Sequence, residues 1–198
     1  MITVGIAVVI IAAVAFFIIN ERAGDNAVTE APEGVSVADA GCDPIEEQDE
    51  EGNEHVEAGT DVEYETSPPT SGDHWPPENV ADAGFYPGEV PEESLVHNLE
   101  HGQIVIWYDP DATSEAKDDL KQFTESQNDF DALPAGSSTQ PIITVPYADV
   151  PEGKSFVLTA WTQSQACSAY SPDAINAFRE KFQGRSPEPI APPFDPDA

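Results

Sequence analysis

The chain has 198 residues, of which 38 are acidic and only seven are Lys or Arg, so its formal net charge is −31. Such a charge repels nucleic acid, and this length leaves room for one folded domain plus an anchor rather than for two large cores. We therefore expect one domain and no nucleic-acid partner. An acidic, lysine-poor composition also suits concentrated salt, where counterions screen self-repulsion, and a halophilic source is our leading interpretation.

The first predicted element is a membrane helix. Residues Ile2–Ile19 carry no charge, and at about 1.5 Å per residue a helix of this length just spans the apolar core of a bilayer. The stretch lacks the basic start and small-residue cleavage point of a signal peptide. We therefore expect an uncleaved anchor over residues 1–20 in contact with membrane lipid. Arg22 favours the opposite orientation by the positive-inside rule, whereas the cysteine pair and the acidic body favour an extracytoplasmic domain at the cell membrane.

Composition divides the rest of the chain into three parts. Residues 21–41 have no periodic apolar pattern and are predicted to form an acidic flexible linker. Residues 42–184 are expected to form the folded extracytoplasmic domain, and the proline-rich residues 185–198 a disordered tail. The only cysteines, Cys42 and Cys167, belong to no CxxC pair. They suggest one disulfide in an oxidising compartment, with a Cys167 thiolate that binds a metal as the competing interpretation.

Within the expected domain, residues 64–77 hold four prolines and a glycine, which forbid regular structure and predict a shaped loop that presents His74. The other elements are bounded by Gly, Pro or a capping residue. In chain order they are a short helix over 92–101, a strand over 103–108, a helix over 114–126, strands over 142–145 and 156–161, and a helix over 172–183. The order β-α-β-β-α predicts an α+β fold, with a small antiparallel sheet and helices on one face.

All four histidines lie between residues 55 and 101. His97 and His101 are spaced i, i+4, so on a helix they project from the same side and can chelate one divalent ion. His74 and His55 are the expected further ligands. Neutral imidazoles suit zinc or copper, whereas a blue-copper site would also need a thiolate and usually a methionine, and the only methionine is Met1. We expect a module that binds or delivers a metal.

Three alternatives remain open at this point. Residues 97–101 match H-x-x-E-H, the inverted zinc-protease signature in which Glu100 would polarise water, but Pro91 and Gly102 limit this helix to about three turns. The histidines could instead hydrogen-bond loop carbonyls in a structural domain, with a possible protein partner at the cell surface. A copper ion that changes oxidation state would give a redox role. Enzymatic activity is not our leading expectation.

Three stretches follow a pattern shared with a known family. They are the loop 68–74, the turn 84–86, and the segment 96–102 with the apolar strand after it. Together they resemble the domain of unknown function 3105 family over about residues 42–182. The resemblance implies one N-terminal membrane anchor and no established activity, and it does not assign the disulfide, because some relatives place their cysteines elsewhere. The family's characteristic positions correspond here to His55, Tyr64, Pro68, Pro69, Ser71, Gly72, His74, His97, Glu100, His101 and Gly102.

Overall fold

A computed structural model describes residues 30–129 and 141–195 of the protein. Its centre is a six-stranded sheet with the strand order β1-β6-β5-β3-β4-β2. The strands are β1 (Glu46–Glu47), β2 (Gly84–Phe85), β3 (Ile104–Tyr108), β4 (Ile142–Pro146), β5 (Phe156–Ala160) and β6 (Gln163–Cys167). The helices are η1 (Pro77–Asn79), α2 (Glu92–Glu100), α3 (Ser114–Gln127) and α4 (Pro172–Phe182). The mixed α+β class expected from the sequence is confirmed.

The sheet is mixed, and the expectation of a purely antiparallel sheet is wrong. Strand β4 runs parallel to β3 and to β2, whereas β5 is antiparallel to both β3 and β6. Helix α3 connects β3 to β4, and such a crossover is what a parallel pair requires. Residues Ile142–Val145 are all β-branched and all buried, which is typical of a parallel strand covered on both faces. Strand β6 was not predicted, because its sequence Gln-Ser-Gln-Ala-Cys has no alternating apolar pattern.

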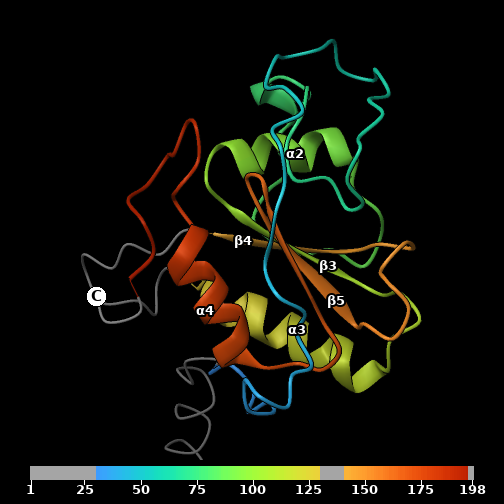
Figure 1. Cartoon of the computed structure of the whole chain (residues 1–198), viewed down its shortest axis with the longest axis vertical. Helices are drawn as coiled ribbons and strands as arrows, with labels where there is room; N and C mark the ends of the chain where they lie inside the picture. Colours follow the sequence, from blue (N-terminus) through green and yellow to red (C-terminus); the bar gives the residue numbers. More distant parts are fainter. Residues whose placement is uncertain (1–29, 130–140, 196–198) are drawn as a thin grey trace, which may run out of the picture.

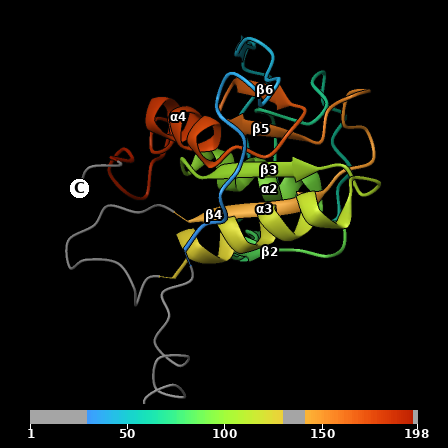
Figure 2. The ribbon, with the colours of Figure 1, turned by 90° about the horizontal axis from the view of Figure 1, so that it is seen from below.

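Helices cover both faces of the sheet, so the expectation that they share one face is also wrong. Helix α2 lies on one side, and α3 and α4 lie on the other (Figures 1 and 2). Successive residues of β3 serve the two faces: Ile104 and Ile106 pack in the cluster with α3 and α4, and Val105 and Trp107 pack in the cluster with α2. Because every residue of β3 is buried, each face of the sheet needs a cover.

The disulfide between Cys42 and Cys167 is confirmed, with a sequence separation of 125, and this bond excludes a free Cys167 thiolate as a metal ligand. In the chain-entropy model a loop of this length stabilises the fold by roughly 4–5 kcal/mol. Residues 30–41 belong to the expected linker, and within them Ala40 is fully buried. The predicted anchor Ile2–Ile19 lies outside the described residues. Across residues 30–129 and 141–195, none of the helices combines the length and the apolar character needed to cross a membrane.

The described part of the expected C-terminal tail, residues 185–195, runs past the end of α2. The amides of Glu188 and Ile190 donate to the carbonyls of Glu100 and His101 at 3.1 and 3.2 Å. Gly102, at φ +85°, ends the helix in a left-handed conformation, and a Cβ atom at this position would lie 2.9 Å from the Cα atom of Gly184. The segment thus contacts the helix end that carries the predicted site. We call residues 185–195 the C-terminal segment.

Candidate metal site

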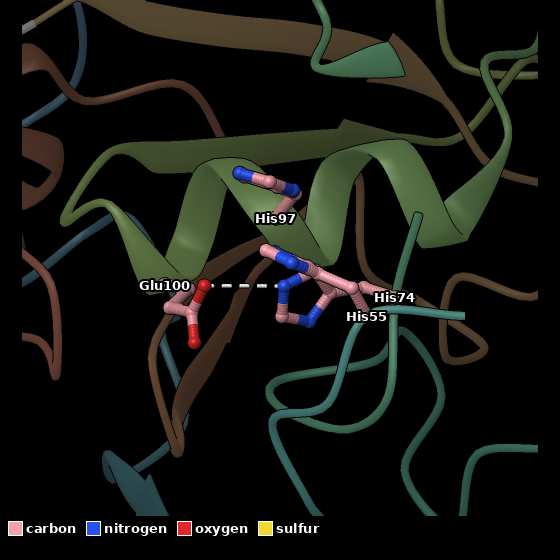
Figure 3. A group of neighbouring side chains, drawn as sticks. All are labelled: His55, His74, His97 and Glu100. Atoms are coloured by element: carbon pink, nitrogen blue, oxygen red, sulfur yellow. Dashed lines mark ion pairs between the residues drawn. The ribbon is translucent and has the colours of Figure 1, made fainter. Parts of the chain in front are cut away.

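Helix α2 contributes two side chains to the candidate site. His97 and Glu100 are spaced i, i+3 and project from the same face, where they are 1% and 3% exposed (Figure 3). The opposite side of α2 packs on the sheet through Leu95 and Leu99. Packing against the sheet therefore fixes the helix and with it the two polar side chains, which face the loops over residues 50–77.

The predicted proline-rich loop holds His74 in place. The imidazole is fully buried, and its Nδ1 atom lies 2.9 Å from the carbonyl oxygen of Gly72. Gly72 has φ +130°, and a Cβ atom there would lie 2.7 Å from the Tyr64 ring, so a side chain at this position would be both strained and crowded. The Tyr64 hydroxyl donates to the carbonyl of Asp73 at 2.9 Å and ties the loop together. These contacts orient the imidazole with little freedom left.

His55 reaches the site through an isolated parallel bridge with His74. The amide of His74 donates to the carbonyl of Glu54 at 3.1 Å, and the amide of Val56 donates to that of His74 at 2.8 Å. The His55 ring stacks on that of His97, with centroids 5.0 Å apart, and meets the His74 ring edge-on at the same separation. His55 is exposed, so it forms the solvent-facing side of the group.

Four side chains converge on one point. One potential ligand atom from each of His55, His74, His97 and Glu100 lies within 4.8 Å of all the others (Figure 3). Two ligands of a tetrahedral zinc ion stand about 3.3 Å apart, given bonds of about 2.0–2.1 Å, so a small contraction would close the set around an ion. Of the four histidines predicted as ligands, three lie in this group. Glu100 completes it, and His101 lies beside it.

Hydrogen bonds define which ring nitrogens are available. The Nδ1 atoms of His74 and His97 lie 2.9 and 2.6 Å from the carbonyl oxygens of Gly72 and Trp75. A carbonyl oxygen only accepts, so each Nδ1 atom carries the proton, and each Nε2 atom of the neutral ring presents a lone pair. Burial lowers the pKa of His97, and the neighbouring imidazoles of His101, His74 and His55 lower it further, which favours this neutral form. Metal-binding histidines are commonly oriented by such a bond from the other ring nitrogen.

The buried pair of His74 and Glu100 lacks a compensating group. Nε2 of His74 lies 3.1 Å from Oε2 of Glu100, yet within the described residues this nitrogen makes no hydrogen bond. In the same part of the chain, no Lys or Arg forms an ion pair with Glu100. A buried lone pair that faces a buried carboxylate is unfavourable unless a proton or a metal ion lies between them. The arrangement is therefore suited to hold a cation.

His101 occupies a position at the rim of this group. Its Nε2 atom lies 2.9 Å from Nε2 of His97, and its Nδ1 atom lies 3.0 Å from the carbonyl oxygen of Glu188 in the C-terminal segment. Because that carbonyl accepts a hydrogen bond from the protonated Nδ1 atom, the neutral rings of His101 and His97 point lone pairs at one another. His101 is partly exposed, in contrast to the buried His97.

The geometry also bears on the protease interpretation. That interpretation needs Glu100 to act on a metal-bound water, with two histidines of the same helix as ligands. Here Glu100 lies within the candidate ligand group itself, and His101 lies outside it. The sequence pattern presented Glu100 only as a group that would polarise water, and not as a candidate ligand. Its i, i+3 spacing from His97 shows only that the two side chains share a helix face, which is equally true of His101.

Comparison with known proteins adds a family. No curated protein and no solved structure matches the chain. A family model described as "Protein of unknown function (DUF3105)" matches residues 55–193. This span is more than half of the chain, begins at His55, and includes the four converging side chains as well as His101. The chain therefore belongs to the DUF3105 family.

Proposed function

We propose that the domain binds one divalent transition-metal ion, zinc or copper, through His74, His97 and Glu100, with His55 as the solvent-facing ligand. The observation that carries this proposal is the convergence of the four side chains, in which the buried Nε2 atom of His74 lies 3.1 Å from the Glu100 carboxylate and makes no hydrogen bond to any other described residue. A purely structural role accounts for the Nδ1 bonds to carbonyls. For the Nε2 atom of His74 that faces the Glu100 carboxylate, a structural role needs a proton between the two groups in place of the metal ion.

The chemistry of the donors limits the choice of ion. Imidazole nitrogen is a favoured ligand of both zinc and copper, and a carboxylate is acceptable to either. Both cysteines are joined in the disulfide, so no thiolate is available to build a blue-copper site. We propose a binding or delivery role rather than hydrolysis, because Glu100 is assigned to the ligand group.

We also propose that the domain lies outside the cytoplasm and is held at the membrane by Ile2–Ile19. The uncharged sequence of that stretch supports an anchor, and the disulfide supports an oxidising compartment. A metal site in such a domain would meet ions or partner proteins at the cell surface.

Equilibrium binding of Zn²⁺ and Cu²⁺ to the chelator-treated full chain tests the metal site. We expect one ion per chain, and we expect His97→Ala, His74→Ala and Glu100→Gln each to weaken binding by more than about tenfold, the loss that even outer-shell changes cause. Glu125→Gln is the matched control for Glu100→Gln, because Glu125 is an exposed residue of α3. Binding that is absent in the wild type, or equal in all variants, would refute the proposal.

A further inference from the structure

We infer that His101 is the exchange ligand of this site, through which the ion passes between the buried group and the ligands of a metal-accepting partner. This inference rests on the proposed metal binding and concerns how the ion moves. His101 does not belong to the group in which all ligand atoms lie within 4.8 Å of one another, yet its Nε2 atom lies only 2.9 Å from that of His97. His101 therefore lies beside the group and contacts it through His97.

The separation of the two Nε2 atoms suits shared coordination of one ion. Two imidazoles bound to a tetrahedral zinc ion, with bonds of about 2.0–2.1 Å, hold their nitrogens about 3.3 Å apart, so a small widening of the pair would admit the ion. The observed distance between His97 and His101 is 2.9 Å. An ion on His97 can thus gain His101 as a ligand before it loses another one. In that step a bond to His101 forms while a bond to Glu100 or His55 breaks, and the oxidation state of the ion does not change.

The surroundings keep the Nε2 atom of His101 ready for this step. The carbonyl of Glu188 accepts a hydrogen bond from Nδ1–H of His101, and the amide of Ile190 donates to the His101 carbonyl, so the C-terminal segment fixes both the ring and the backbone. The same segment binds the carbonyl of Glu100 through the amide of Glu188. The C-terminal segment therefore holds Glu100 and His101 in fixed positions relative to each other.

Exposure shows where a partner can approach the site. His74, His97 and Glu100 are at most 3% exposed, whereas His101 is partly exposed and His55 is exposed. Incoming ligands from a partner can therefore approach past His55 or past His101, and of these two only His101 lies outside the ligand group and can take up the ion as an additional ligand. The partner is accordingly a protein or small molecule that offers nitrogen or sulfur ligands of its own.

The test is the rate at which zinc-loaded full chain gives up Zn²⁺ to an excess of a chromophoric chelator, with the equilibrium affinity measured in parallel. For His101→Ala we expect one Zn²⁺ per chain, an affinity close to that of the wild type, and transfer at least about tenfold slower, which corresponds to about 1.4 kcal/mol in the barrier. His55→Ala is the matched control. Because His55 belongs to the ligand group, its loss should weaken binding and speed up release.

Slower zinc transfer in His101→Ala together with faster release in His55→Ala would support the inference. Faster release and weaker binding in His101→Ala would make His101 an ordinary ligand, and an unchanged rate would make it a bystander; either result overturns the exchange role. His101→Gln, which keeps a hydrogen-bonding side chain, replaces His101→Ala if the alanine variant does not fold. A wild-type chain that binds no Zn²⁺ would refute the proposed function itself, and the inference with it.

Discussion

Helices α2 and α3 lie on opposite faces of the same sheet and are built on different principles. Helix α3 has 14 residues, of which only Leu120, Phe123 and Thr124 are buried. Helix α2 has nine residues, and all except Glu92 are buried. The first is an ordinary amphipathic helix that attaches through one apolar stripe. The second is enclosed on all sides, although five of its buried residues are polar.

The difference shows what holds the candidate site. The polar side chains of α2 bond to distant loops: Glu93 accepts from the amide of Val62 at 3.1 Å, and Asn98 bonds both the amide and the carbonyl of Ala81. His97 completes the set through the carbonyl of Trp75. The α3 face thus supplies apolar packing, and the α2 face supplies an oriented polar interior in which ligands can be fixed.

Among substitutions that distinguish the two faces of the sheet, we expect Phe123→Ala to have the largest effect on stability. The Phe123 side chain is fully buried in the cluster on the α3 face, so we expect its removal to lower the free energy of unfolding by about 3–5 kcal/mol. The affinity of the folded variant for Zn²⁺ should not change. Urea unfolding and zinc titration at low denaturant check the two parts. Glu125→Ala on the exposed side of α3 is the control, and a loss of zinc affinity in Phe123→Ala would show that the two faces are coupled.

The next effect concerns stabilisation by the metal. Free Zn²⁺ at about 100 times its dissociation constant should raise the free energy of unfolding by about 2.7 kcal/mol, because the unfolded chain does not preserve the converging ligands. The increment should fall to about 1.4 kcal/mol or less in His97→Ala, as a tenfold or greater loss of affinity requires, and persist in Thr113→Ala. Denaturant unfolding with and without Zn²⁺ measures it. An equal increment in His97→Ala would mean that zinc binds elsewhere.

The smallest effect tests how each helix begins. The Thr113 side chain caps α3 by accepting from the amide of Ala116 at 3.2 Å, whereas α2 follows Pro91, which offers no such bond. Thr113→Ala should therefore lower the free energy of unfolding by about 1 kcal/mol, and Thr113→Ser should restore most of the loss. We expect Pro91→Ala to have no comparable capping effect. An equal loss in the serine variant would exclude the capping bond as the cause.

Local signals in the sequence were sufficient for much of the fold. The helices expected over 114–126 and 172–183 are found at Ser114–Gln127 and Pro172–Phe182, and Gly102 has a left-handed conformation where α2 ends. The strand directions in the sheet and the placement of helices on its two faces depended instead on contacts between distant segments. Whether β4 lies parallel to β3, and whether polar β6 pairs with β5, is decided by contacts that no single segment encodes. Helices were therefore placed correctly along the chain and incorrectly around the sheet.

The same distinction applies to the site. Clustering of histidines in one stretch of sequence pointed to His55, His74 and His97 as companions, and the structure brings them together. The choice between Glu100 and His101 could not be made from the sequence, because i, i+3 and i, i+4 neighbours share one helix face. That choice depends on where the His74 loop and the C-terminal segment approach α2. Both are tertiary contacts.

The disulfide has a mechanical consequence. It joins Cys42, which precedes the histidine-bearing loops, directly to Cys167 at the end of β6. Tension applied through the N-terminal part of the chain passes at Cys42 into the sheet by a covalent route. The loops over residues 55–75 lie beyond that junction and outside the path of the load. A domain pulled from its N-terminus would therefore pass the load to strand β6 of the sheet rather than through the candidate ligands.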